Sequence, residues 1–221
     1  MKRLRLACAV TFIVTALAVT GGAVSESARQ TAANPVPVEQ EPQHHPVFKN
    51  DVLAVLDVRL PPGYVSLFHT HSNDNVSVRI ETALTRTDTP TETGTPQTAV
   101  VGRVVFNSAH PPYTHRIANL GVTAIRIVDI EVLAAGPTRV VSTFDELAGH
   151  DIALDNDRVR ISRITLDPGT TVPGHSHPRG WLEVTVRGPE PGSFRWREAG
   201  AIAPTLTGGA AGAEYVEIAV K

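Results

Sequence analysis

The chain has 221 residues, 42% of them hydrophobic, and its 20 basic side chains nearly balance its 22 acidic ones. This length and composition fit one large domain or two small ones with a substantial core. The sequence contains neither a basic stripe nor an acidic block, which argues against a nucleic-acid partner.

The first 25 residues predict a secretory signal peptide. The positive segment MKRLR is followed by the apolar run LACAVTFIVTALAV and by small residues, with a cleavage site at Ala23 to Ser25. This run of about 14 residues is shorter than the ~20 that a spanning helix needs. We therefore expect export to the periplasm or the extracellular space, with no membrane attachment after cleavage; a retained N-terminal anchor is the alternative.

Residues 26–46 predict a linker, because they are polar and rich in proline and show no apolar period. His44 and His45 fall inside this segment. Adjacent histidines in such a tether are expected to be solvated.

From residue 47 onward the sequence predicts β-structure. Short segments rich in Val and Ile alternate with Pro and Gly turns, a pattern typical of an antiparallel sandwich or barrel. Residues 142–151 could hold a helical turn. The predicted strand regions are 51–60, 76–84, 98–106, 123–133, 158–166, 181–188 and 213–221.

An internal repeat divides this β region into two domains, residues 47–137 and 138–221. Residues 48–71 align without a gap on residues 154–177, at an offset of 106. Near the ends of the two halves the offset falls to 88. The difference lies at residues 85–98, a segment rich in Thr and Pro that we expect to be an exposed hairpin insertion.

Each half carries a pair of histidines two residues apart behind a Pro-Gly turn. In an extended strand such residues face the same side, so His69 and His71 could share one metal ion. A held divalent ion needs at least a third protein ligand. The first half offers His110 and His115 for this role, whereas Ala203 stands opposite His115 in the second half.

These motifs resemble those of the cupin superfamily. Its first motif is Gly, five residues, then His-x-His, and it matches Gly63 to His71 and Gly169 to His177. The end of its second motif, His followed by Asn four residues later, matches His115 to Asn119. The resemblance implies two tandem jelly-roll barrels of the cupin type, with an internal site that often holds Fe, Mn, Zn, Ni or Cu.

The ligand sets that the resemblance implies depart from the family pattern. The glutamate of the first motif is missing, and Asp74 is the carboxylate nearest to its place. The predicted first site is therefore His69, His71 and His115, completed by Asp74 or water. A weaker second site would combine His175 and His177 with Glu183, which stands later than the family spacing.

Barrels of this kind can also lose the metal and keep the histidines around a small-molecule pocket. His110 and Trp181 are candidate ligand-binding residues, with a surface position and core packing as their respective alternatives. Arg79 could bind an anion if its side chain shares the face of His71. The sequence shows no phosphate-binding loop, dinucleotide motif or nucleophile elbow.

The predicted function is thus the binding of one divalent metal ion, a small molecule, or both in the first barrel of an exported protein. Two alternatives stay open: a metal-dependent enzyme of the oxygenase or isomerase type, and a metal-free binding or structural module. Homo-oligomerisation is also left open.

Overall fold

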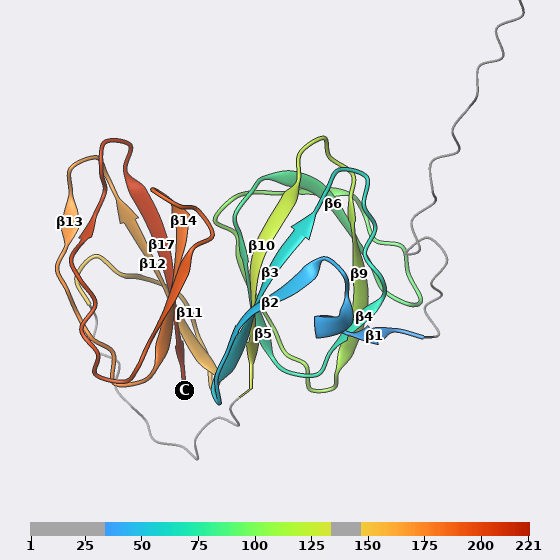
Figure 1. Cartoon of the computed structure of the whole chain (residues 1–221), viewed down its shortest axis with the longest axis horizontal. Helices are drawn as coiled ribbons and strands as arrows, with labels where there is room; N and C mark the ends of the chain where they lie inside the picture. The colour runs from blue at the N-terminus through green and yellow to red at the C-terminus, as the bar shows by residue number, and fades with distance from the viewer. Residues whose placement is uncertain (1–33, 134–146) are drawn as a thin grey trace, which may run out of the picture.

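The computed structural model describes residues 34–133 and 147–221, and strands make up nearly all the regular structure in these ranges (Figure 1). The predicted all-β fold is confirmed. The signal peptide at 1–25, the domain boundary at 137–138 and the first half of the segment considered for a helical turn, residues 142–146, lie outside the described residues. We refer to residues 34–133 as the first unit and to residues 147–221 as the second unit.

The first unit is a barrel built from two five-stranded sheets that face each other. The outer sheet has the order β1 (Val36–Pro37), β4 (His69–His71), β9 (Tyr113–Asn119), β6 (Ala83–Asp88) and β7 (Gln97–Ala99). The inner sheet has the order β2 (His44–Lys49), β3 (Leu53–Leu60), β10 (Ile125–Val132), β5 (Asn75–Arg79) and β8 (Val104–Asn107). A short 3-10 turn, η2 (Val38–Gln40), joins β1 to β2.

The second unit repeats the inner sheet strand for strand. Its order is β11 (Asp151–Asp155), β12 (Val159–Leu166), β17 (Ala213–Val220), β14 (Trp181–Arg187) and β15 (Phe194–Arg197). Its outer layer includes the two-stranded sheet of β13 (Thr171–Val172) and β16 (Leu206–Thr207). Strands β3 and β12 even share one burial pattern along their eight residues.

The linker prediction for residues 26–46 is wrong over its last part. Val36 pairs in parallel with His69, and β2 begins at His44 and pairs with β3. Proline is tolerated here because β1 and β2 are edge strands, where a missing N–H removes no ladder bond. His44 is buried rather than solvated, since its Nδ1 lies 2.6 Å from Oε2 of the buried Glu41.

The insertion predicted at residues 85–98 is a hairpin, as expected. Strands β6 and β7 pair antiparallel at its base, from Ala83 opposite Ala99 to Thr85 opposite Gln97. The loop between these strands is largely exposed. The difference in length between the two halves therefore falls in a surface connection and leaves the paired strands undisturbed.

A shared apolar core joins the two units. The inner sheets lie back to back at the centre of Figure 1, and alternate residues of their strands meet between them. Side chains of the opposite parity point into each barrel. The buried residues of the shared core are Leu53, Val55, Val76, Val78, Ile80, Val128, Ile130, Val132, Val159, Ile161, Leu182, Val184, Val186, Val216, Ile218 and Val220.

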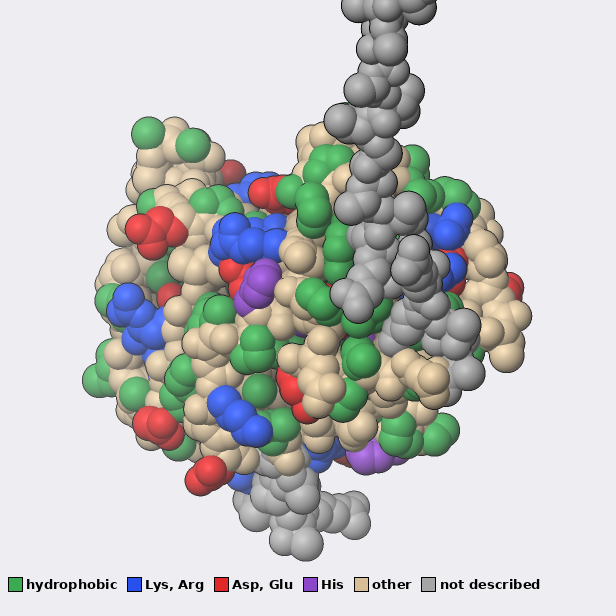
Figure 2. All heavy atoms as spheres, turned by 45° about the vertical axis from the view of Figure 1, so that its right-hand side comes forward, with side chains coloured by type: hydrophobic (Ala, Val, Ile, Leu, Met, Phe, Trp, Pro, Cys, Tyr) green, Lys and Arg blue, Asp and Glu red, His purple; other side chains and the backbone are tan. Residues whose placement is uncertain are grey.

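Arginines cross the rim of this interface in both directions. From the first unit, Arg126 donates to the carbonyl oxygen of Pro191, at 2.5 Å. From the second unit, Arg163 donates to the carbonyl of Gly102 at 2.5 Å, and Arg158 Nε lies 2.6 Å from Asp74 Oδ2. On the face shown in Figure 2, Lys and Arg side chains are interspersed with Asp and Glu.

We expect Asp74→Asn to destabilise the protein by about 1.5–3 kcal/mol at pH 7, because it removes a buried, charge-assisted bond to Arg158. Burial alone would raise the pKa of Asp74, but the Ala109 N–H and Arg158 lower it below its usual range. Its contribution is therefore complete above the unfolded pKa of about 3.9 and is lost as the pH falls through the lower folded value.

Urea unfolding of wild type and Asp74→Asn at pH 7 and pH 3 measures this difference. It should be large at pH 7 and smaller at pH 3. Asp51→Asn, at an exposed turn, is the matched control and should resemble wild type at both values. A difference that does not depend on pH would contradict the role assigned to the ionised carboxylate.

Candidate metal centres

The first histidine cluster lies inside the first barrel, on its outer sheet. His69 and His71 project from β4 on the same face, and the antiparallel pairing with β9 places His115 directly opposite His69. The nitrogen atoms that these three rings offer all lie within 4.8 Å of one another. The structure thus brings together the three histidines that the sequence predicted as the first site.

Hydrogen bonds at the far side of two rings determine which nitrogen faces the centre. His69 Nδ1 donates to the carbonyl oxygen of Leu67, at 2.9 Å, which leaves the lone pair on Nε2. That Nε2 atom is buried and has no hydrogen-bond partner among the described residues. His71 Nδ1 lies 2.6 Å from Glu131 Oε1, and its Nε2 is 3.3 Å from His115 Nε2.

The surroundings keep these imidazoles in the neutral form that binds metal. Burial lowers the pKa of His69 well below its usual value, and the neighbouring His115 lowers it further. Burial also lowers the pKa of His71, and it lowers that of His115 to about 3. Because a ligating histidine must be unprotonated, the cluster is ready to bind a cation at neutral pH.

Asp74 and His110 do not join this cluster. Asp74 Oδ1 accepts the Ala109 N–H at 2.9 Å within the first unit, and its Oδ2 accepts from Arg158 of the second unit, so both oxygens already have partners. The side chain of His110 is 70% exposed and lies 3.8 Å from Asp74. The prediction that Asp74 completes the first site is therefore wrong, because Asp74 lies outside this cluster.

The carboxylates beside the first cluster come from β10 instead. Asp129 and Glu131 are buried, and together with His71 their ligand atoms lie within 4.8 Å. Burial raises the pKa of Asp129, and it raises that of Glu131 to about 7. The sequence analysis missed both because they stand in an apolar strand far from the histidines. Their spacing of two residues, which gives both the same inward face, was the available signal.

A cavity of about 190 Å³ opens beside the cluster. Its walls include His71 and His115. They also include Arg79 of β5 and Arg103, which lies in the turn before β8. Arg79 therefore lines the cavity from the inner sheet, whereas His71 and His115 line it from the outer sheet. Nη1 of Arg79 is buried without a hydrogen-bond partner in the described part of the chain.

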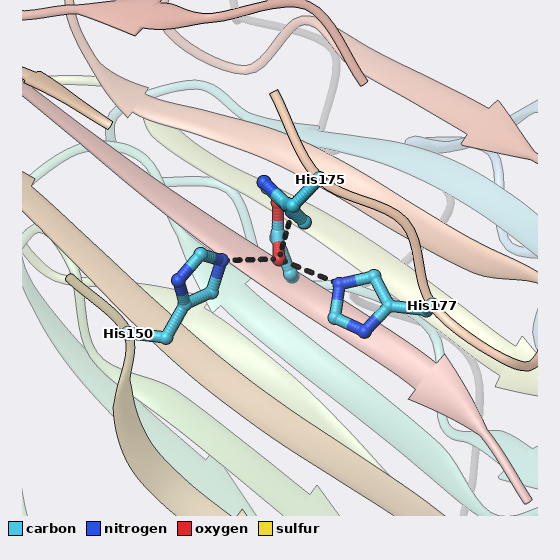
Figure 3. A group of neighbouring side chains, drawn as sticks. His150, His175 and His177 are labelled. Atoms are coloured by element: carbon cyan, nitrogen blue, oxygen red, sulfur yellow. Dashed lines mark hydrogen bonds and ion pairs between the residues drawn. The ribbon is translucent and has the colours of Figure 1, made fainter. Parts of the chain in front are cut away.

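A second cluster lies inside the second barrel and is centred on Glu217 of β17 (Figure 3). Oε2 of Glu217 lies 3.1 Å from Nε2 of His150 and 3.0 Å from Nε2 of His177. Nε2 of His175 lies 3.1 Å from the other carboxylate oxygen. Each of the three histidine side chains is at most 8% exposed.

This second cluster lacks the predicted Glu183 and has two members that were not predicted. Glu183 faces Glu217 across the β14–β17 pair, but its Oε2 lies 3.4 Å from Arg197 Nη2, and it is outside the group of converging ligand atoms. His150 and Glu217 were missed. The repeat contained the signal, since the offset of 106 places His150 on His44 and the offset of 88 places Glu217 on Asp129.

Trp181 forms a wall of the second cluster. It is fully buried, and its ring stacks on that of His175 at a centroid distance of 5.5 Å and an interplanar angle of 28°. Its edge contact with His177 has a centroid distance of 4.6 Å. These contacts are those of a residue packed in the core, which was the alternative to a ligand-binding role for Trp181.

Comparison with solved structures shows which fold this is. The bacterial pirin YhhW from Escherichia coli, solved in complex with nickel(II), matches with a TM-score of 0.57 and 12% identity, over 80% of this chain and 89% of that one. The chain has the cupin fold. YhaK from E. coli matches with a TM-score of 0.53 and 14% identity, over 83% of this chain and 94% of that one.

A further cupin-fold match is the salicylate 1,2-dioxygenase from Pseudaminobacter salicylatoxidans, with a TM-score of 0.54 and 11% identity, over 76% of this chain and 71% of that one. No family model and no curated protein sequence matches the chain. Within the described ranges, no helix has the length and apolar character needed to cross a membrane.

We expect Glu131→Gln to weaken metal binding at the first cluster about 10–100-fold, because the carboxylate orients His71 through Nδ1. Competition with a chromophoric chelator for Ni²⁺ or Zn²⁺ measures this affinity. Glu81→Gln, at an exposed turn, is the control and should leave it unchanged. Equal affinities for Glu131→Gln and wild type would show that His71 does not depend on this contact.

Proposed function

We propose that the first barrel binds one divalent metal ion through Nε2 of His69, His71 and His115, and that a small anionic molecule occupies the adjacent cavity. The observation that carries the proposal is the buried Nε2 of His69. Its lone pair points toward two other imidazoles and meets no donor among the described residues. A buried polar atom without a partner is costly, and a cation at this point would satisfy it.

The donor set indicates the class of metal. Three neutral imidazoles suit Zn, Cu, Fe or Ni, and three protein ligands leave coordination positions open for a small molecule. Such an ion supplies Lewis acidity at the end of the cavity. A bacterial pirin with the same fold was solved in complex with nickel(II), which supports the proposal.

The anionic character of the ligand rests on two arginines in the cavity. Burial, together with the charge of Arg103, lowers the pKa of Arg79 to about 10, so the guanidinium is still charged at neutral pH. Both side chains line the cavity, and Nη1 of Arg79 meets no acceptor in the described residues. A carboxylate is the group whose geometry a guanidinium fits best.

We also propose that the protein is exported and that its two barrels are a tandem repeat. The pattern of residues 1–25 supports export. The gapless alignment of residues 48–71 on 154–177 supports the repeat, together with the equal strand order of the two inner sheets.

Metal analysis tests the first part of the proposal. The protein is purified without chelators and reconstituted with Ni²⁺ or Zn²⁺, and bound metal is measured by plasma mass spectrometry. His69→Ala should lose about one equivalent per chain relative to wild type, because it removes one of the three proposed ligands of the first cluster. His45→Ala, at an exposed position, should lose none. Equal metal content in His69→Ala and wild type would refute the site.

Carboxylate binding tests the second part. We expect Arg79→Gln to weaken the binding of benzoate to the metal-loaded protein about 10–100-fold, the effect of losing one charge-assisted hydrogen bond. Isothermal titration calorimetry measures it. Arg59→Gln alters an arginine whose side chain is 55% exposed and should leave the affinity unchanged. If wild type does not bind carboxylates, or binds them no better than Arg79→Gln, the anionic ligand is wrong.

A further inference from the structure

Strand β5 forms part of the cavity wall in the first barrel, and the second unit packs against its reverse face. Its alternate residues Asn75, Ser77 and Arg79 line the cavity. The residues between them, Val76 and Val78, lie in the shared apolar core. Because successive side chains of a strand point to opposite faces, the position of this wall depends on what packs behind it.

A turn at the end of β5 fixes the backbone of Arg79 on both sides. The amide of Arg79 donates to the carbonyl oxygen of Arg103 at 2.9 Å, and the amide of Gly102 donates to the carbonyl oxygen of Arg79 at 2.8 Å. Arg103 lines the cavity as well. The backbone of both cavity arginines is thus tied to residues 101–103, which we term the arginine turn.

Three residues of the second unit hold the arginine turn. Arg163 Nη2 donates to the carbonyl oxygen of Gly102 at 2.5 Å, and Arg187 Nη2 donates to that of Val101 at 3.4 Å. Nη1 of Arg163 and Nη1 of Arg187 donate to the two carboxylate oxygens of Glu214. The side chain of Glu214 is only 5% exposed, so this buried anion orients both guanidinium groups toward the turn.

The strands of the second unit explain how these side chains reach the first unit. Arg163 of β12 and Glu214 of β17 have the same parity as the residues that these strands contribute to the shared core. In β14 a register shift places Arg187 opposite Glu214, where a regular strand would place Val186. A bulge of this kind re-aims a side chain, and here it brings a second arginine to the interface.

The close approach of the arginine turn requires glycine at its centre. Gly102 has a φ of 83°, in the left-handed region that glycine adopts without strain. A Cβ at this position would lie 2.7 Å from Oε1 of Glu214 and 3.1 Å from Nη1 of Arg163. The backbone of the turn therefore sits directly against the charged groups of the second unit.

The second unit also holds the other end of β5. Arg158 Nε lies 2.6 Å from Oδ2 of Asp74, the residue that precedes Asn75. The second unit thus contacts this strand before its first residue, along its reverse face and beside its last residue.

We propose that the second unit is a positioning element of the first-barrel site, and that Arg163 is a positioning residue that sets the affinity of the cavity for anions by fixing Arg79 through the arginine turn. The inference rests on the proposed binding of a carboxylate at Arg79. Guanidinium groups that line one cavity repel each other, so their positions must be held by the backbone before an anion binds. Contacts made from outside the barrel provide that support.

Benzoate binding to the Ni²⁺-loaded protein tests the role of Arg163. We expect Arg163→Gln to weaken the affinity about 3–30-fold, the range for a residue that acts on a ligand through intervening groups. The Ni²⁺ content should not change, because the first histidine cluster lies on the outer sheet. Isothermal titration calorimetry measures the affinity, and plasma mass spectrometry measures the metal.

Arg126→Gln is the matched control. It removes another arginine that crosses the same interface, but Arg126 contacts the carbonyl oxygen of Pro191 rather than the arginine turn. It should lower the stability of the protein and leave the benzoate affinity unchanged.

A double-mutant cycle separates positioning from a general effect on the fold. In the Arg79→Gln background, adding Arg163→Gln should weaken benzoate binding further by less than about twofold, because the side chain that Arg163 positions is already lost. Equal fold-changes in the two backgrounds would show that Arg163 does not act through Arg79.

Amide hydrogen exchange, followed by NMR, gives a readout that needs no ligand. The amides of Arg79 and Gly102 should exchange faster in Arg163→Gln than in Arg126→Gln, since both are bonded within the turn that Arg163 holds. Arg163→Lys keeps a cation beside Glu214 but lacks the planar fork that reaches two acceptors. It should change affinity and exchange in the same direction, and it replaces Arg163→Gln if circular dichroism shows that variant to be unfolded.

Two outcomes would overturn the proposal. One is that the Arg163 variant binds benzoate as tightly as wild type does. The other is that the amides of Arg79 and Gly102 exchange no faster in it than in Arg126→Gln. Failure of the proposed function appears separately, as wild type that binds no benzoate, and the exchange rates then still decide whether the second unit holds Arg79.

Discussion

The packing of the two inner sheets against each other is the constraint on which the rest of this structure depends. Each inner strand has two buried faces, one in the shared core and one inside its own barrel, because successive side chains alternate. Strand β10 sends Val128 and Ile130 into the shared core and Asp129 and Glu131 into the first barrel. Strand β17 does the same with Val216 and Ile218 on one side and Glu217 on the other. Packing of the apolar side chains in the shared core therefore fixes each strand, and with it the acidic side chains on the opposite face of that strand.

The histidines depend on a second, local device. In His69, His150 and His175 alike, Nδ1 lies close to the backbone carbonyl two residues earlier in the chain. This contact orients the ring and assigns the proton, so that Nε2 faces the barrel interior. His71 is oriented by a carboxylate instead. These contacts hold the rings of both clusters in one orientation, and a preorganised side chain loses less entropy when it binds a ligand.

The sequence was sufficient to predict the fold, the three histidines of the first cluster and two of the four members of the second. Alternation and turn signals identified the β-structure, and the repeat located both His-x-His pairs together with His115. These features are local, or they recur at a constant offset. By contrast, Glu131 and Glu217 look like ordinary polar residues in apolar strands, and their role emerges only when β10 and β17 pair with β3 and β12.

The errors have physical causes as well. Asp74 stands at the right distance from the His-x-His pair along the chain, but Arg158 and the Ala109 N–H occupy both of its oxygens. The polar composition of residues 36–46 concealed two edge strands, since edge strands need little apolar surface and tolerate proline. His44 was misread for the same reason, and the aligned position in the second unit, His150, was missed as a member of the second cluster.

The two-sided character of β17 has a consequence for how this chain can change in length. A single-residue insertion or deletion within the strand would exchange the two faces, sending Glu217 into the apolar interface and a valine or isoleucine into the barrel. One such event would remove the carboxylate that the three histidines of the second cluster contact, and it would bury an unpaired charge in the apolar core between the units. The loop of the hairpin at residues 85–98 is largely exposed, so a change in its length exchanges no buried faces, and the two halves differ in length there.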